Sequence, residues 1–278
     1  MRGESQAARR LLPSPPPPEE IRAGGGGGVA GWRPPDVPPC GATTSPCARG
    51  ATGWGNLIPA GAHPFKEELN ELNRWYQGQR PAGGDGGTGR PSDRPEIQDR
   101  SPDAVVLAVG PRRCPGAGDR QPQGDRLRHR PHRPDLPGQR VLVVGGGLVG
   151  CETALGYAQA GKQVTILEAL PDILSAGIPV PEMNDSMLRD LLDEAGVVRR
   201  TGRRLSRVTE DGAVADGPDG EEKLSADHIV LAVGFAPRTS LAPELAGAGM
   251  EVYQVGDGSR VGSVMTAIGS AYTVGRML

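Results

Sequence analysis

The sequence has few aromatic residues and no closely paired cysteines. Aromatic side chains make up 3% of the chain, and the arginine-rich run at residues 126–133 has no aromatic neighbours, which argues against a nucleic-acid patch. The formal net charge of −2 likewise offers no electrostatic attraction to nucleic acid. No two of the four cysteines have CxxC spacing, which excludes the usual redox-active dithiol and a clustered zinc or iron–sulfur site.

Long apolar runs are also lacking. No stretch is long enough to cross a membrane, and the first residues do not resemble a signal peptide. We therefore expect a cytoplasmic protein that holds no metal and has neither a membrane nor a nucleic acid as a partner.

Glycine and proline, in contrast, are abundant, with 43 and 28 residues, most of them before Arg140. Residues 1–52 have almost no apolar periodicity, so we expect most of this segment to be poorly ordered. Residues 80–101 and 111–139 are similar tracts. Two origins remain open for them: natural disorder encoded by a GC-rich gene, and translation in a shifted reading frame. Reading the gene in all frames distinguishes the two.

Two segments between these tracts have the patterns of folded elements. Pro64 suits the first turn of a helix, and the acidic residues that follow it favour the N-terminal end of that helix. Residues 103–110 form a continuous apolar run ending in glycine, typical of a strand buried on both faces. The apolar residues of the predicted helix fall on one face, namely Phe65, Leu69, Leu72 and Tyr76.

From Arg140 onwards the chain alternates between strand and helix patterns, which predicts an α/β fold. The second predicted helix has an apolar side formed by Met183, Met187, Leu188, Leu191 and Leu192. The expected elements are strands at 141–144 and 163–168, helices at 148–160 and 181–195, short strands within 197–224, a buried strand at 227–234 and a final helix within 264–278.

A glycine motif joins the first strand of this region to its first helix. Gly145, Gly147 and Gly150 have GxGxxG spacing, and the flanking strand, helix and second strand make the motif specific for a dinucleotide. The first glycine permits a sharp turn, the second lets a pyrophosphate approach the backbone, and the third lets helix and strand pack closely. The helix N-terminus offers free N–H groups to the phosphates. The predicted binding loop is Gly145, Gly146, Gly147, Leu148, Val149 and Gly150.

An acidic residue, Glu168, ends the second strand. Its carboxylate is placed to accept hydrogen bonds from both adenosine ribose hydroxyls, and it would repel a 2′-phosphate. No arginine follows within residues 169–171. We therefore expect NAD as the nucleotide, with NADH favoured over NADPH.

Three other polar residues have more than one interpretation. Glu152, in the first turn of the helix, is either an acid favoured by the helix dipole or a group near the nicotinamide. His228 lies within a buried strand pattern and is interpreted as structural. His63 precedes a predicted helix and is interpreted as a simple surface residue.

Several stretches of the sequence, including the glycine loop, resemble the C-terminal half of the NADH:flavin oxidoreductases related to 2,4-dienoyl-CoA reductase and trimethylamine dehydrogenase. These enzymes belong to the pyridine nucleotide-disulfide oxidoreductase superfamily. The glycine loop is generic to two-dinucleotide-domain flavoproteins, whereas GNLIPAGAHPFK at residues 55–66 is more specific to this family. Further matching stretches are PDAVVLAVG at 102–110, VLVVGGGLVGCETALGYAQAGKQVTILEALPDI at 141–173, ADHIVLAVGFAPRTSLAPEL at 226–245 and EVYQVGDG at 251–258.

The resemblance implies a Rossmann-like fold in which an NAD domain at residues 140–235 is inserted into an FAD domain. Residues 53–139 and 236–278 would form the flanking FAD domain. Gly256 and Asp257 match the family's second FAD motif, where the Asp binds the ribityl chain, and Gly234 is a further cofactor-binding candidate. Hydride would pass from NADH to FAD. In complete members electrons then reach an iron–sulfur cluster and FMN in a barrel domain, for which this chain has no counterpart.

One departure concerns the first FAD fingerprint, which should lie about thirty residues before Gly55. We find no VxGxGxxG strand–loop–helix there, so we expect an incomplete FAD domain and impaired FAD affinity. A non-catalytic NADH-binding module is therefore the alternative to a flavin-linked oxidoreductase. A dehydrogenase of the short-chain type is disfavoured because no Tyr has Lys at the Tyr-x-x-x-Lys spacing. No residue qualifies as a catalytic acid, base or nucleophile, which fits flavin chemistry.

Overall fold

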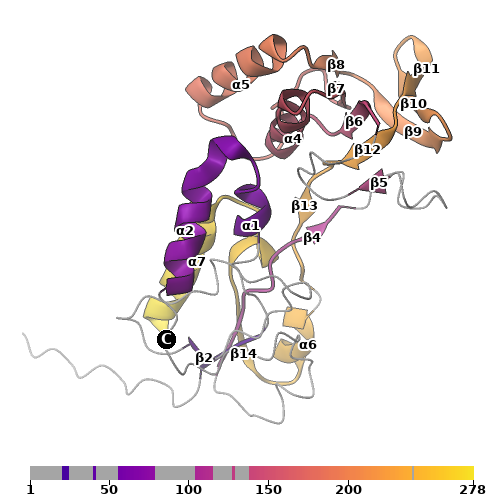
Figure 1. Cartoon of the computed structure of the whole chain (residues 1–278). Helices are drawn as coiled ribbons and strands as arrows, with labels where there is room; N and C mark the ends of the chain where they lie inside the picture. The colour runs from indigo at the N-terminus through magenta and orange to yellow at the C-terminus, as the bar shows by residue number, and fades with distance from the viewer. Residues whose placement is uncertain are drawn as a thin grey trace, which may run out of the picture.

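A computed structural model describes residues 21–24, 40–41, 56–78, 104–114, 127–128, 138–239 and 241–278 (Figure 1). Of the tracts at 80–101 and 111–139, whose origin the sequence left open, residues 80–101, 115–126 and 129–137 lie outside the described residues. The described chain contains two parallel sheets, each with its own hydrophobic core. We call residues 138–234, together with the short strand at 127–128 that pairs with them, the central unit, and the other sheet with its helices the flanking unit.

The central unit is built on a five-stranded parallel sheet. The continuous apolar strands suit such a sheet because both of its faces are covered. Its register pairs Val141 with Val164 and His228 with Val141. The strand order is β5 (Leu127–Arg128), β12 (His228–Leu231), β6 (Arg140–Val144), β7 (Gln163–Leu167) and β8 (Val198–Arg200).

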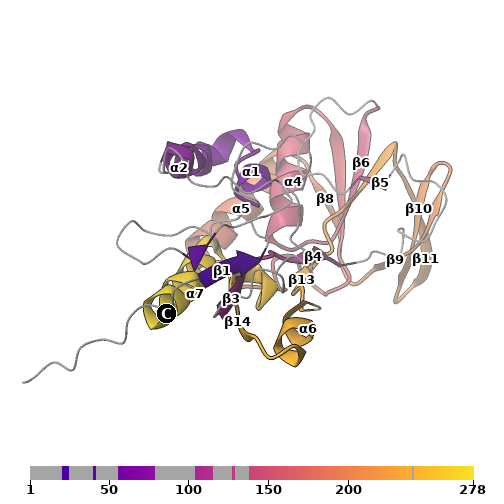
Figure 2. The same ribbon diagram turned by 90° about the horizontal axis from the view of Figure 1, so that it is seen from below.

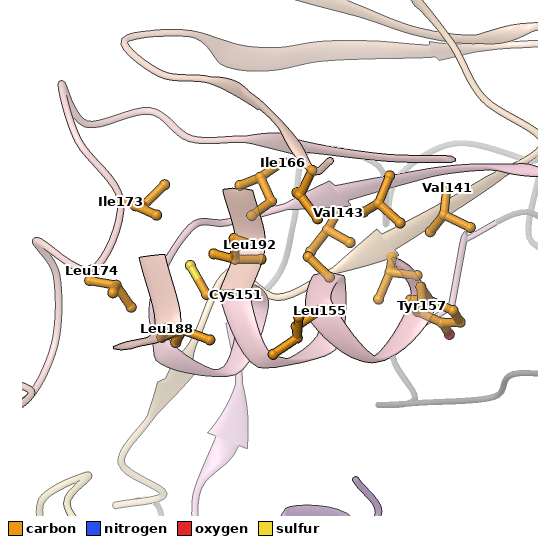
Figure 3. Packing of buried hydrophobic residues seen from close by; sticks show 14 residues of the cluster. Val141, Val143, Cys151, Leu155, Tyr157, Ile166, Ile173, Leu174, Leu188 and Leu192 are labelled. Carbon is orange, nitrogen blue, oxygen red and sulfur yellow. The ribbon is translucent and has the colours of Figure 1, made fainter. Parts of the chain in front are cut away.

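Two helices cover one face of this sheet. They are α4 (Leu148–Gln159) and α5 (Glu182–Glu194), both close to the predicted bounds. Figure 3 shows Cys151 and Leu155 of α4 packed toward Val143 and Ile166 of the strands. Tyr157 is fully buried in the same cluster. The α4 helix ends before Gly161, whose φ of 81° is the left-handed conformation favoured at this position.

The apolar side predicted for α5 is only partly correct. Leu188 and Leu192 are buried and Leu191 packs against the core, but Met183 and Met187 are 85% and 57% exposed. The apolar stripe of α5 is wider than the surface that α4 and the sheet offer, so the two methionines face away from the core.

An antiparallel meander covers the other face of the central sheet. It consists of β9 (Arg204–Thr209), β10 (Gly212–Gly217) and β11 (Gly220–Ser225), as the Asp-Gly turns predict. Leu142 and Leu167 of the sheet pack against Val208 and Ala215 of the meander. At Gly212 a Cβ would lie 2.0 Å from the carbonyl oxygen of Leu224, so only glycine fits this turn.

The flanking unit contains a four-stranded parallel sheet. Its order is β14 (Glu251–Gln254), β3 (Ala104–Leu107), β1 (Ile21–Gly24) and β2 (Cys40–Gly41). The expectation of disorder over residues 1–52 is therefore wrong at β1 and β2. β1 pairs in register with all four residues of β3, and this long-range pairing leaves no periodic signal in so short a strand. The rest of 1–52 lies outside the described residues.

Helices accompany the flanking sheet. Their bounds are α1 (Leu57–Ala60), η2 (Pro64–Lys66), α2 (Glu67–Gly78), α6 (Leu241–Gly247) and α7 (Val264–Met277). Tyr76 and Leu72 of α2 pack against Ala267 of α7, and Leu245 of α6 packs on Leu107 of β3. Phe65, placed on the buried face by its spacing, is 42% exposed because it lies in the short η2 turn, ahead of the helix.

The two units are joined by two chain segments that run side by side (Figures 1 and 2). β4 (Arg112–Arg113) enters the central unit and β13 (Phe235–Ala236) leaves it, and the two form an antiparallel pair. Adjacent entry and exit are what an inserted domain requires.

Candidate functional site: a glycine loop at the edge of the central sheet

The glycine loop turns sharply at the end of β6. Gly145 has a φ of 105°, and its N–H donates to the carbonyl of Leu167 at 2.8 Å. A Cβ on Gly145 would lie 2.4 Å from the carbonyl oxygen of Ala232. The position therefore requires glycine both for its backbone conformation and for its contact with the chain after β12.

The other two motif glycines have different surroundings. A Cβ on Gly150 would lie 1.9 Å from the carbonyl oxygen of Gly145, so α4 can approach the loop only because this side chain is absent. A Cβ on Gly147 would meet nothing within 4 Å. This open space lies beside the first turn of α4, whose N–H groups have no acceptor within the helix. Leu148 and Val149 of this turn are 39% and 49% exposed.

Glu168 follows β7 directly and reaches back to the loop. Its Oε2 accepts a hydrogen bond from the Gly146 N–H at 2.5 Å, and its Oε1 accepts one from the Leu170 N–H at 2.7 Å. The side chain is 8% exposed. Each carboxylate oxygen has two lone pairs, so each retains capacity for one further donor. The loop and the carboxylate are thus held together as one rigid group.

Residues 172–174, which we call the covering segment, pack over the glycine loop, a contact that the sequence did not predict. The Leu174 N–H donates to the Gly146 carbonyl at 2.7 Å, and the Cys151 thiol donates to the same oxygen at 3.3 Å. Leu174 has a φ of 59°, which is rare for a residue other than glycine. Burial raises the pKa of the Cys151 thiol to about 12, which agrees with its interpretation as a core residue.

Arg189 of α5 holds this covering segment. Its guanidinium donates to Asp185 at 2.5 Å, to Asp172 at 3.0 Å and to the Ile173 carbonyl at 2.9 Å. These carboxylates raise the pKa of Arg189, and Arg189 in turn lowers the pKa of Asp172. A helix residue thereby supports the loop next to the glycine motif, a contact with no signature in local sequence.

Glu152 has a partner that neither of its two interpretations anticipated. It forms an ion pair with Lys66 at 2.5 Å, and the two side chains are 12% and 25% exposed. The pair links α4 of the central unit to η2 of the flanking unit. His63 lies nearby in sequence and is 3% exposed, stacked on Phe65 at 5.1 Å, so its interpretation as a surface residue is wrong. His228 is 8% exposed within β12, as a structural role predicts.

The remaining candidate residues lie elsewhere. Gly234, with a φ of 91°, lies at the exit from the central unit, and its carbonyl accepts from the Cys114 N–H at 3.1 Å. Gly256 and Asp257 form the short helix η4 (Gly256–Gly258) after β14, in the flanking unit. The structure thus groups Gly145 to Gly150 with Glu168, and it places Gly256 and Asp257 at a second site.

Asp257 is partly buried at this second site. Its carboxylate accepts from the Gly262 N–H at 2.9 Å and also bonds the side chain of Asn56. Burial raises the pKa of Asp257 above its usual range, against the opposing effect of these hydrogen bonds. Gly256 has a φ of 62° and donates its N–H to the Ser270 hydroxyl at 2.9 Å.

We expected no strand–loop–helix fingerprint before Gly55, and this expectation is wrong for the strand. β1 lies beside β3, and the sequence at 26–31, Gly-Gly-Gly-Val-Ala-Gly, has GxGxxG spacing shortly after β1 ends. The spacing was readable, but the surrounding glycine and proline runs hid it. Residues 25–39 lie outside the described residues.

The described residues contain no group of three or more His, Cys, Asp or Glu side chains arranged to hold a metal ion. In the same part of the chain, no helix combines the length and the apolar character needed to cross a bilayer.

The chain matches a known protein family and many known proteins. The family described as pyridine nucleotide-disulphide oxidoreductase matches residues 89–268. The cinnamate reductase of Clostridium sporogenes is 34% identical over 227 residues, which cover 80% of this chain and 34% of that protein. The NADH oxidase of Thermoanaerobacter brockii is 31% identical over 238 residues, covering 79% and 35%. The chain therefore spans about a third of the length of these relatives.

Solved structures share the fold. A structure of 2-naphthoyl-CoA reductase superposes with a TM-score of 0.72 at 21% identity, covering 94% of this chain and 40% of that one. Histamine dehydrogenase from Rhizobium sp. 4-9 superposes with a TM-score of 0.68 at 15% identity, covering 93% and 41%. At these identities the likeness shows the fold alone.

Proposed function

Because the chain belongs to the pyridine nucleotide-disulphide oxidoreductase family, we propose that it binds NADH at the Gly145–Gly150 loop and passes hydride to FAD held by the flanking unit. The observation that best supports this nucleotide site is the hydrogen bond that joins the glycine loop to the Glu168 carboxylate. Gly146 donates to Glu168, the Gly147 side of the loop is open, and the first turn of α4 is free to donate to phosphate.

The preference for NADH over NADPH is part of this proposal. Glu168 is anchored by two backbone N–H groups, so its carboxylate cannot swing away to admit a second negative group. Its remaining lone pairs suit the two ribose hydroxyls. A 2′-phosphate would place like charges in contact at a site that is 8% exposed.

The residues of the flanking unit fit a second dinucleotide. Asp257 is a half-buried carboxylate at the C-terminal end of a parallel strand, the edge where such sheets bind ligands. Asp257 would hold the ribityl hydroxyls. FAD supplies the hydride acceptor when bound. Gly234 lies at the junction of the two units, where the reacting ends of the two nucleotides would meet.

The final electron acceptor in this proposal is not part of the segment that matches the relatives. The relatives' named substrates, such as cinnamate, belong to proteins of which this chain covers only about a third, so no such substrate is assigned to this chain. The proposed partner for the electrons is an FMN and iron–sulfur barrel domain like that of complete family members.

The visible spectrum of the purified chain tests the proposal. We expect flavin absorbance, alone or after reconstitution with FAD, and bleaching of that absorbance when NADH is added without oxygen. A chain that binds NADH in calorimetry but stays colourless after reconstitution would instead be the non-catalytic NADH-binding module.

A dehydrogenase that uses a tyrosine as its acid is not supported. Tyr157, the tyrosine within α4, is fully buried in the hydrophobic core and cannot reach a substrate at the glycine loop.

A further inference from the structure

We propose that Glu222 enforces the preference for NADH by restraining two arginines, Arg200 and Arg203, that flank the ribose carboxylate Glu168. The inference rests on the proposed nucleotide site and assigns a positioning role to a residue far from the glycine motif in sequence. Glu222 lies on β11 of the meander, paired with Ala215 of β10.

The arginine segment is attached to the Glu168 segment by backbone hydrogen bonds. The Glu168 N–H donates to the Arg200 carbonyl at 2.9 Å, and the Arg203 N–H donates to the Glu168 carbonyl at 2.9 Å. The Gly202 N–H donates to the Leu170 carbonyl at 2.7 Å. Both arginines are therefore direct backbone neighbours of Glu168.

Glu222 draws both guanidinium groups toward the meander. Its Oε1 accepts from Nε of Arg200 at 3.0 Å, and its Oε2 lies 3.2 Å from Nε of Arg203. Asp219 adds a second contact to Arg203 at 3.1 Å. Arg203 is only 19% exposed and lies across Gly217, where a Cβ would come within 2.5 Å of its guanidinium. The glycine leaves room for this restrained position.

The charges in this cluster balance. Two guanidinium groups face the carboxylates of Glu222 and Asp219, so Glu168 remains the uncompensated charge at the ribose end of the site. A guanidinium is the side chain best suited to bind a phosphate through paired hydrogen bonds. Arginines released from Glu222 would supply the group whose absence after Glu168 disfavours NADPH.

The test compares two neighbouring glutamates of β11 in the full chain. Glu222→Gln frees the arginines, whereas Glu221→Gln removes an ion pair with Arg207 and serves as the matched control. Calorimetry with 2′,5′-ADP and 5′-AMP measures the 2′-phosphate contribution without flavin or turnover. We expect Glu222→Gln to improve 2′,5′-ADP binding by about tenfold relative to 5′-AMP, the size of one charge-assisted hydrogen bond.

Further variants separate positioning from a general structural effect. Glu222→Asp keeps the charge and should keep the wild-type ratio of affinities. Adding Arg200→Gln and Arg203→Gln to Glu222→Gln should abolish the gain, and raised salt should weaken it. An unchanged ratio in Glu222→Gln, or an equal gain in Glu221→Gln, would overturn the inference. Failure of the wild-type chain to bind 5′-AMP or NADH would overturn the proposed nucleotide site itself.

Discussion

At the scale of single residues, the three motif glycines of the loop are required for different reasons. Gly145 and Gly150 satisfy packing within the fold, because a Cβ at either would strike backbone oxygen. Gly147 meets no protein atom, so the fold itself places no demand on it. The absence of a side chain there is explained by the nucleotide phosphates that the loop is proposed to bind.

This division predicts opposite results for two alanine variants. Gly150→Ala should lower the free energy of unfolding by about 1–3 kcal/mol, since an added methyl group overpacks the contact between helix and loop. Gly147→Ala should leave stability within about 0.5 kcal/mol of wild type but weaken NADH binding. Urea unfolding and calorimetry measure the two effects. Equal stability losses in both variants would contradict the assignment.

Asp227 provides a pH-dependent contribution at the start of two strands. Its carboxylate accepts from the N–H groups of Gln139 and Arg140 at 2.8 and 2.9 Å and pairs with the Arg140 guanidinium at 2.7 Å. These bonds hold the pKa of Asp227 well below its usual range. Because the folded pKa is depressed, the stabilisation is present above the unfolded pKa of about 4 and is lost as pH falls below it.

We therefore expect Asp227→Asn to destabilise the chain at pH 7 and to matter progressively less as the pH falls below about 4. Urea unfolding of wild type and variant across this range gives the difference directly. Glu221→Gln, which removes another exposed partner of an arginine, is the control. A difference that stays constant with pH would show that the Asp227 charge is not the stabilising feature.

At the scale of elements, α5 has a role beyond covering the sheet. Its Arg189 side chain reaches the covering segment at Asp172 and Ile173, and Leu174 of that segment contacts the Gly146 carbonyl. The helix α5 thus holds the covering segment, and the covering segment in turn holds the glycine loop. Only part of the apolar face of α5 is needed for packing, which leaves Met183 and Met187 exposed.

Replacement of Arg189 tests this support. Arg189→Ala should destabilise the chain by about 1–3 kcal/mol, because the Ile173 carbonyl and two carboxylates lose their donor. It should also weaken NADH binding several-fold by loosening the segment over the loop. Arg207→Ala, which removes an exposed pair with Glu221, serves as the control and should change neither quantity appreciably. Unaltered NADH affinity in Arg189→Ala would separate α5 from the site.

At the scale of the whole molecule, the central unit is inserted between segments of the flanking sheet, and the expected α/β fold and family resemblance are confirmed. The β4–β13 pair joins the units, and the ion pair between Lys66 and Glu152 connects them beside the glycine loop.

A double-mutant cycle measures this connection. Lys66→Met and Glu152→Gln should each destabilise the chain, and their interaction free energy should be about 0.5–1.5 kcal/mol because the pair is largely shielded from water. Lys66→Met should also slow flavin reduction by NADH if the pair sets the relative position of the units. The exposed pair of Glu71 and Arg74 is a matched control and should give a coupling below about 0.5 kcal/mol.

The sequence by itself determined the βαβ segment from Val141 to Glu168. Its strand, glycine turn and helix are contiguous, so periodicity and glycine spacing report them directly. The meander turns and the helix at the C-terminus were predictable for the same reason. In these parts of the chain, local sequence and tertiary contacts favour the same structure.

Only the tertiary structure decided the features that join distant segments. The strand β1 is identified by its pairing with β3. The burial of His63 and the ion pair between Lys66 and Glu152 are seen only once the segments around them pack together. The restraint of Arg200 and Arg203 by Glu222 likewise depends on how the meander packs on the sheet. Long-range packing and charge pairing depend on which surfaces meet in space, so spacing along the chain cannot encode them.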